Sequence, residues 1–508
     1  MSKNKIVVLS DIHISTNEPT NWYQKNFHER YLSAILDYVI NNAATIQELV
    51  LLGDIFDSWT YPPNVRPPAF AEIIAANPSI LGVNGKLSKV CQALDGNVTY
   101  VNGNHDIDVT KDDWDRVQKS SGYQVKYCPD PIYYVQTGKG QKIAFTHGHT
   151  FTLFNAPDHR TPISPIPVGY FVTRAVGYML NHTLKPGETV ADLADQGSPN
   201  SIDLGGLVSS VASLISSGNL VNAILDYIMD VTRIPETEPI VLPDGKTTSI
   251  GAAKEMYKNL QGQWIADSGQ GENGTLALLK SVIADLDGTY IAWFAQQSAL
   301  KSNSDLIVLG HTHFPKLGIT NGLVKYANGG FECPSSPDLT KKAFTFSVVD
   351  TDNCQAIIHQ VTKQNNTYQI VPFDASPDSV IAGTSMDYSC YIIIDNPRES
   401  STLNLINYSK DRGNYVVAPP EQILPGQQGK FWLQDYTGLK GSRGSVTYST
   451  GAGSQSLTFT YDCPMGAASN KCSGANFYTS NDGVNWESLN KIKKFGYPLH
   501  PFFVKFVL

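Results

Sequence analysis

Five short apolar runs along the chain have the length and the β-branched composition of buried strands. They cover residues 5–9, 48–52, 98–101, 143–146 and 306–309. Each run ends in a polar stretch with Asp, Asn or His, and four of these stretches also contain a glycine. Glycine permits tight turns that aim a neighbouring side chain outward. The pattern therefore predicts five strands with polar tips at their carboxyl ends, where open α/β sheets place their ligand sites.

Between the first three runs, the apolar positions follow the spacing of helices. Residues 27–42 carry apolar side chains at positions 31, 32, 35, 36, 39 and 40, which form one stripe of a helix. Residues 83–94 predict a second covering helix, whereas the proline-rich residues 58–70 predict an irregular loop. Strands that alternate with helices in this way predict an α/β fold with a mostly parallel sheet and helices on its faces.

Residues 151–304 break this alternation and predict a mostly helical cap, inserted between the fourth and fifth strand tips. Helical spacing recurs in residues 204–215 and 220–228, and no charged side chain occurs between Leu204 and Leu225. Further helices are predicted over 250–262 and 274–298. Two interpretations of these two helical segments remain open. They form either a hairpin that packs on the rest of the cap, or an apolar surface for acyl chains, a bilayer or a partner subunit.

The C-terminal third of the chain alternates apolar and polar residues, as strands do. Residues 323–326, 343–349 and 356–361 predict antiparallel strands that complete a second sheet against the first. Residues 374–386 have the composition of a linker. Beyond it, short β-rich runs separated by Gly, Pro, Asn and Ser predict an antiparallel β-sandwich over residues 387–508.

Composition narrows the possible partners and compartments. A net charge of −8 over 508 residues argues against sequence-independent binding of nucleic acid, which requires a basic surface. The first strand begins close to residue 1 and no run of eighteen apolar residues occurs, so we expect neither a signal peptide nor a spanning helix. The expected localisation is the cytoplasm, with a membrane-peripheral position or leaderless secretion as alternatives. The seven scattered cysteines predict free thiols, although Cys463 and Cys472 could close a small loop in an oxidising compartment.

The strand tips carry the candidate chemistry. In chain order they read Asp11-x-His13, Gly53-Asp54-x-x-Asp57, Gly103-Asn104-His105-Asp106, His147-Gly148 and Gly310-His311-x-His313. Together they resemble the motif set of the calcineurin-like metallophosphoesterases, over about residues 5–360. The resemblance implies a four-layer α/β/β/α sandwich as the catalytic domain, over residues 1–373. In relatives that cleave lipid-linked UDP-sugars, Asp often follows the fourth motif, where this chain has His149, so the subfamily stays open.

The same resemblance implies two divalent metal ions and a role for each motif residue. One ion would be held by Asp11, His13 and His313. The other would be held by Asn104, His147 and His311, with Asp54 bridging the two. Manganese, iron and zinc all suit these ligands. Two such cations activate a shared water and clamp both oxygens of an in-line displacement at phosphorus.

Further residues are implied around the metal ions. His105 would stabilise the transition state or protonate the leaving oxygen, with Asp106 holding its ring. Asp57 would lie behind the ligands or accept hydrogen bonds in a turn. Three further residues have two alternative roles: each either contacts the substrate phosphate or has a structural or solvated role. These are His149, His159 and Arg160.

A shorter resemblance concerns the C-terminal region. Gly444-Ser445-Val446-Thr447-Tyr448, residues 460–466 and Ser469-Asn470 resemble the aegerolysin family of small lipid-binding β-sandwiches. The resemblance implies that residues 387–508 recognise membrane lipid. The alternative is a sandwich that packs on the enzyme or binds sugar.

These features favour an enzyme that hydrolyses a phosphate ester. The apolar cap and the implied lipid-binding sandwich favour a phosphodiester with a hydrophobic or lipid group, and a membrane lipid bound through the cap or the sandwich. A nucleotide or small-molecule phosphodiesterase or phosphomonoesterase is the alternative within the same class. A different class, a toxin-like lipid- or glycan-binding protein led by the sandwich, also remains open.

Overall fold

The first strand, β1 (Lys5–Leu9), is buried on both faces. Ile6 and Val8 pack against a second sheet, whereas Val7 and Leu9 pack against helices. A strand with this double burial needs a layer on each side.

The computed structural model describes residues 3–195, 214–215, 218–267, 274–288, 290–320, 324–331, 343–365, 367–375, 388–435, 440–450, 455–466, 468–480, 486–488 and 501–508.

The first sheet has seven strands and is mixed. Its order is β14 (Thr367–Pro372), β13 (Gln355–Gln364), β12 (Phe344–Asp350), β1, β2 (Ile46–Leu52), β3 (Val98–Val101) and β4 (Lys126–Cys128). β1 to β4 are parallel, and β12 pairs antiparallel with β1. We predicted that residues 343–349 and 356–361 join the second sheet, and this is wrong. Alternating apolar residues indicate that a segment is a strand, but they do not indicate which sheet edge it joins.

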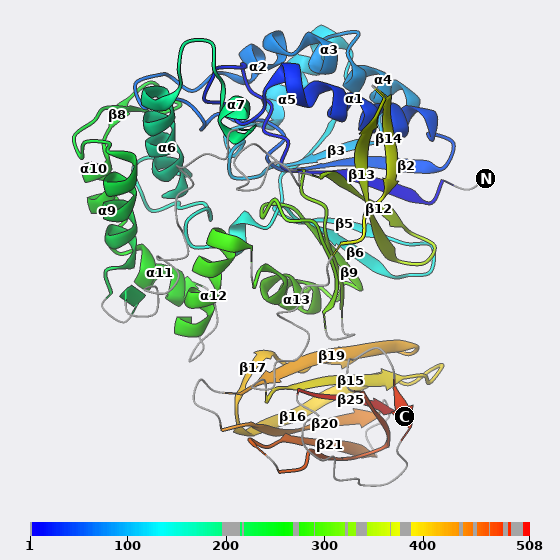
Figure 1. Cartoon of the computed structure of the whole chain (residues 1–508). Helices are drawn as coiled ribbons and strands as arrows, with labels where there is room; N and C mark the ends of the chain where they lie inside the picture. The colour runs from blue at the N-terminus through cyan, green and yellow to red at the C-terminus, as the bar shows by residue number, and fades with distance from the viewer. Residues whose placement is uncertain are drawn as a thin grey trace.

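The second sheet has five strands in the order β10 (Lys316–Thr320), β11 (Val324–Asn328), β9 (Leu306–Leu309), β6 (Lys142–Phe145) and β5 (Tyr133–Gln136). β9 is parallel to β6 and to β11. The two sheets face each other, as Figure 1 shows. Mostly aliphatic side chains fill the core between them. The carboxyl ends of β1, β2, β3, β6 and β9 all lead into the predicted metal motifs.

Helices cover the outer face of each sheet and complete the four-layer α/β/β/α fold. The first sheet is covered by α1 (Lys25–Asn41), α2 (Phe70–Ala76), α3 (Pro78–Leu81), α4 (Lys86–Ala93) and α5 (Lys111–Ser121). The second sheet is covered by α13 (Ile291–Lys301), which packs on β9 and β11. We predicted that residues up to 304 belong to the cap. α13 instead forms the outer helical layer of the second sheet, since its apolar faces lie against that sheet.

The remaining helices in the described part of residues 151–304 form a cap around an apolar core that also includes Trp59. They are α6 (Gly169–Thr183), α7 (Val190–Asp195), α9 (Leu220–Thr232), α10 (Ile250–Met256), α11 (Leu260–Asp267) and α12 (Gly274–Asp287), with the hairpin β7 (Ile240–Val241) and β8 (Thr247–Thr248). The apolar stripe of α9 is buried in this core, which confirms the packing interpretation for residues 220–228. Of the predicted helix 204–215, only residues 214–215 lie within the described chain. None of the helices in the described part is long and apolar enough to cross a membrane.

The C-terminal region is rich in strands and fits an all-β domain. One sheet has the order β17 (Asn414–Val417), β19 (Gln427–Gln434), β15 (Cys390–Asn396), β25 (Phe502–Val507), β23 (Asn476–Ser480) and β24 (Glu487–Ser488). The other has the order β18 (Gln422–Ile423), β16 (Leu403–Arg412), β20 (Ser442–Thr450), β21 (Ser456–Cys463) and β22 (Lys471–Ser473). The predicted sandwich is not wholly antiparallel, because β15 and β25 run parallel. Cys463 and Cys472 are buried and are not joined by a disulfide, and most of the predicted linker lies outside the described residues.

α13 also joins the catalytic part to the C-terminal strands, as Figure 1 shows. Trp293 of α13 meets Trp432 of β19 edge to face, with ring centroids 5.7 Å apart. Tyr391 and Phe503 of the same sheet lie in the same apolar cluster. The inner face of α13 therefore packs on the catalytic sheet, and its outer face packs on the C-terminal sheet.

Truncation of Trp432 tests this shared core. Trp432 is among the largest fully buried side chains, so we expect Trp432→Ala to lower the free energy of unfolding by about 3–5 kcal/mol. Chemical denaturation measures this change. Ile406→Ala, at a side chain that is 53% exposed on β16, should change it by less than about 0.5 kcal/mol. Equal and small effects of both substitutions would contradict the packing described here.

Candidate metal centre

The loops that follow the strands hold five candidate ligands in an unusual backbone conformation. Asp11, His13, Asp54, His311 and His313 all have φ between 50° and 75°. Non-glycine residues adopt this left-handed region rarely, and each such residue costs on the order of 1–3 kcal/mol. Strain of this kind persists where the surrounding structure imposes it, and it clusters at functional sites. Its concentration in these loops marks them as the functional centre.

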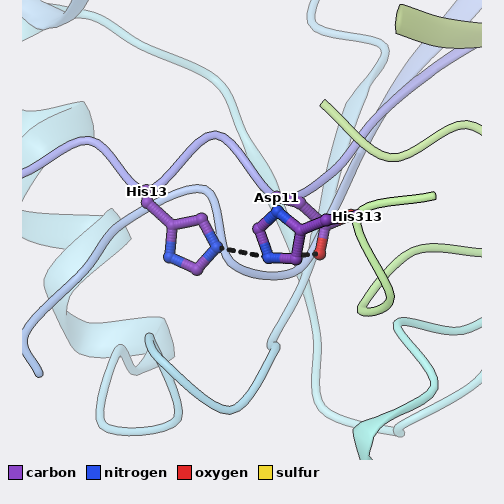
Figure 2. A group of neighbouring side chains, drawn as sticks. All are labelled: Asp11, His13 and His313. Atoms are coloured by element: carbon purple, nitrogen blue, oxygen red, sulfur yellow. Dashed lines mark hydrogen bonds and ion pairs between the residues drawn. The ribbon is translucent and has the colours of Figure 1, made fainter. Parts of the chain in front are cut away.

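The first group of candidate ligands comes from the loops after β1 and β9. Asp11, His13 and His313 place their ligand atoms within 4.8 Å of one another. Figure 2 shows the two rings turned toward each other. The Nε2 atoms of His13 and His313 are 3.2 Å apart. Nε2 of His313 is 3.9 Å from Oδ1 of Asp11. Two imidazoles and a carboxylate in this arrangement form a nitrogen and oxygen donor set for one divalent cation.

The second group comes from the loops after β2, β6 and β9. Asp54, His147 and His311 also place their ligand atoms within 4.8 Å of one another. Oδ2 of Asp54 is 3.2 Å from Nε2 of His147 and 3.8 Å from Nε2 of His13. This single carboxylate oxygen therefore lies between the two groups, as a bridging ligand would. Its other oxygen, Oδ1, accepts a hydrogen bond from the backbone N–H of His105.

Asn104 supplies the observation that best tests the fit of a second cation. Its Oδ1 is buried and has no hydrogen-bond partner among the described residues. A buried amide oxygen without a partner carries a desolvation cost that a cation would remove. The donor set of Asn104, Asp54 and two imidazoles lacks thiolates and suits a hard or borderline divalent ion. The residues present thus fit two ions, and they do not identify the metal.

Partners behind the ligands set the orientation of the imidazole rings. Nδ1 of His13 lies 3.1 Å from Oδ2 of Asp57, and Nδ1 of His147 lies 2.9 Å from the carbonyl oxygen of Leu52. An acceptor at Nδ1 places the proton there and leaves the lone pair of Nε2 for a metal ion. In the neutral form, both histidines therefore have the tautomer that ligation through Nε2 requires.

His105 lies beside both groups and is held by Asp57. Nδ1 of His105 is 3.2 Å from Oδ1 of Asp57, and the ring stacks on Trp59 with centroids 4.4 Å apart. The same carboxylate oxygen accepts backbone hydrogen bonds from Trp59 and Thr60. Asp57 thus lies against the rings of His13 and His105 and also accepts hydrogen bonds within its own turn.

The predicted contact of Asp106 with His105 is wrong. The carboxylate of Asp106 accepts hydrogen bonds from the backbone N–H groups of Ile55, Phe56 and Gly103. It therefore ties the second motif loop to the third. Asp106 is next to His105 in sequence, but the backbone turns its side chain toward these N–H groups instead.

Burial and charge shift the titration of several groups. Burial disfavours the imidazolium of His147, but the carboxylates of Asp54 and Asp11 outweigh this and raise its pKa to about 9. Burial likewise opposes the charged form of His105, and Asp57 and Asp54 raise its pKa above the ordinary value. Burial and the neighbouring His147 and His311 hold the pKa of His149 well below the ordinary value. His149 is therefore neutral at pH 7.

The three predicted substrate contacts lie in different surroundings. His149 is buried beside His147, with ring centroids 5.4 Å apart. Arg160 pairs with Asp158 and Asp267, and Nδ1 of His159 contacts the hydroxyl of Ser164. The structure therefore places only His149 at the metal centre.

Sequence reasoning missed three residues at this centre. The indole of Trp22 lies 4.8 Å from the ring of His13 and 5.0 Å from that of His105, measured between centroids. Asn155 contacts Asn104, and Asp285 of cap helix α12 contacts His311. None of the three belongs to a strand tip, so the pattern that found the other residues does not extend to them.

The fold and these candidate metal-binding groups fit the class of the metallophosphoesterases. Residues 4–188 match the family model described as calcineurin-like phosphoesterase, so the chain contains a domain of this family and is a phosphoric ester hydrolase. The match ends before the fifth motif, Gly310-His311-x-His313. This motif follows β9 and lies at the same centre as the other four.

Among solved structures, the chain is similar to Vacuolar Protein Sorting 29 from Cryptosporidium parvum, with 11% identity, 73% of this chain and 96% of that chain covered, and a TM-score of 0.26. It is similar to a dimetal phosphatase from Danio rerio at 11% identity, with 73% and 99% covered and a TM-score of 0.26. It is also similar to RahU protein in complex with TRIS at 14% identity, with 23% and 92% covered and a TM-score of 0.18. No curated protein matches the chain. The resemblance to aegerolysins stays a prediction.

Metal binding should release a proton from His147. The metal-free pKa of about 9 means that His147 is protonated at pH 7, and the imidazolium must lose its proton to ligate. We expect the apparent affinity of the second ion to rise about tenfold per pH unit between pH 7 and 9 and then to level off. Calorimetric titration of the metal-free protein, in buffers of different ionisation enthalpy, measures both the affinity and the proton release. A pH-independent affinity without proton release would contradict the charge state described for His147.

Proposed function

We propose that the protein hydrolyses a phosphodiester by in-line displacement at phosphorus. Asp11, His13 and His313 hold one divalent ion, and His147, His311 and Asn104 hold a second. The observation that carries this proposal is the position of Asp54, whose Oδ2 lies within 4 Å of an imidazole nitrogen from each group. When bound, two such ions lower the pKa of a shared water and stabilise the attacking and leaving oxygens.

The role of the protein residues is to orient the substrate and to move a proton. Nδ1 of His105 lies 3.2 Å from Oδ1 of Asp57, an ion-pair distance, and the stacked Trp59 keeps the ring in one plane. The opposite nitrogen, Nε2, is then available to the substrate. As an imidazolium, His105 donates a hydrogen bond from Nε2 to a phosphate oxygen and then transfers that one proton to the oxygen of the leaving group, which leaves the imidazole neutral.

The charge of the centre favours a diester over a monoester. Asp285 adds a carboxylate in contact with His311, and His149 beside His147 is neutral. A phosphate monoester carries a second negative charge at neutral pH, whereas a diester carries one. The extra carboxylate repels the doubly charged substrate more strongly.

Trp22 favours an apolar or aromatic substituent on the phosphate. Its partly exposed indole borders His13, His105 and His313, so it offers a flat apolar surface next to the leaving group. The apolar stripe of α9, one reason to expect a lipid substrate, is instead buried in the cap. A nucleotide diester, whose base stacks on the same indole, is the second candidate.

A metal-reconstituted assay separates these substrates. We expect a higher kcat/KM for bis-p-nitrophenyl phosphate than for the mono-ester, and Trp22→Ala should raise KM for the diester about three- to tenfold through loss of ring stacking. Trp22→Phe retains a ring and serves as the matched control. Preference for the mono-ester would contradict the charge argument, and an unchanged KM in Trp22→Ala would contradict the stacking role.

The proton-transfer role is tested at His105. His105→Ala should lower kcat by about 10²–10⁴-fold, because the leaving oxygen loses its proton donor, while the metal content stays at two ions. Elemental analysis of the purified variant measures the metal content alongside the kinetics. Loss of both ions in His105→Ala would show that the residue is a ligand and that this role is wrong.

A further inference from the structure

A carboxylate from the cap reaches the metal centre. Asp285 lies in the last turn of α12, and its side chain is only 3% exposed. Its Oδ1 is 3.3 Å from Nε2 of His311 and accepts a hydrogen bond of 2.7 Å from Nδ2 of Asn155. We infer that Asp285 is a positioning residue for the second metal ion, acting on His311 directly and on Asn104 through Asn155. This inference rests on the proposed function, because it deepens the description of the same centre.

The neighbours of His311 determine which ring nitrogen carries its proton. A carboxylate only accepts hydrogen bonds, so Asp285 requires an N–H at Nε2 of His311. The hydroxyl of Thr152 lies 3.4 Å from the same nitrogen and donates its own proton to the carbonyl oxygen of His149. Both neighbours of Nε2 are therefore acceptors. The proton lies on Nε2, and the lone pair of Nδ1 is left for the metal ion.

A second line of contacts determines which way the amide of Asn104 points. Because Asp285 accepts, the NH₂ group of Asn155 must face it, and Oδ1 of Asn155 must face away. That oxygen accepts a hydrogen bond of 3.2 Å from Nδ2 of Asn104. The amide oxygen of Asn104 is thereby turned to the remaining side, where it is buried without a partner among the described residues. The same carboxylate thus sets the ligand atom of two different side chains.

Close packing holds Asp285 in this position. Its Oδ2 accepts a hydrogen bond of 2.8 Å from the backbone N–H of Phe154. Gly288 ends α12 with φ +72°, and a Cβ there would lie 2.9 Å from Cβ of Thr312. The end of the cap helix therefore approaches the fifth motif too closely for a side chain. Gly169 likewise leaves space that a Cβ would take from Oδ1 of Asn155.

Zinc titration of the full-length, metal-free protein tests the role of Asp285. In Asp285→Asn, the affinity for the second zinc ion should fall about 10–100-fold, while the first ion binds as in the wild type. Asp226→Asn is the matched control, since Asp226 is an exposed cap carboxylate that pairs with Lys254. Asn155→Ala breaks only the path to Asn104, so it should weaken the second ion while the tautomer of His311 is unchanged.

Nitrogen-15 spectra of histidine-labelled protein give a readout besides activity and affinity. In the zinc-loaded wild type, His311 should be protonated at Nε2 and bound to zinc through Nδ1, and Asp285→Asn should lose this preference. Zinc bound through Nε2 in the wild type would overturn the inference, and so would an unchanged second affinity in Asp285→Asn. Two bound ions with the expected order of affinities, but no hydrolysis of any phosphate ester, would overturn the proposed function alone.

Discussion

The centre depends on one buried carboxylate that lies between two sets of imidazoles. Asp54 is almost fully buried, and the positively charged forms of the surrounding histidines hold its pKa well below the ordinary value despite that burial. An isolated charge in such a place would be strongly destabilising, so it requires positive charge nearby. Protonated imidazoles supply that charge in the metal-free protein. In the metal-loaded enzyme, two cations would supply this positive charge instead. A ligand nitrogen can therefore bind either a proton or a metal ion, but not both.

The fold brings this charge arrangement about by collecting loops from separate strands. Parallel strands end at the same edge, so the loops after β1, β2 and β3 meet there, and those after β6 and β9 meet them from the facing sheet. The strained backbone at five candidate ligands shows that these loops are held in place by their surroundings. Asp106 contributes by tying two of the loops together through their backbone N–H groups. The cap contacts this edge through α12. The C-terminal strands pack on α13, on the face of the second sheet that points away from the first sheet.

Much of the centre could be predicted because its signal is local. A β-branched run followed by Asp, Asn or His identifies a strand tip without knowledge of its neighbours. Contacts between distant segments have no such signal. The sequence therefore predicted that Asp106, the neighbour in the chain, holds His105, whereas in the structure Asp57 lies against this ring. Asp285 and Asn155 meet across 130 positions of sequence, and neither stands in a recognisable pattern. The same limit explains why β12 and β13 were predicted in the wrong sheet, although both were correctly predicted as strands.

The central claim is that Asp54 bridges two metal ions. Crystals of the full-length protein grown with zinc, with data collected on both sides of the zinc absorption edge, test it most directly. The account predicts two anomalous peaks, one on each side of the Asp54 carboxylate, with Asp11, His13 and His313 around the first and Asn104, His147 and His311 around the second. A single peak, or peaks that Asp54 does not touch, would contradict it.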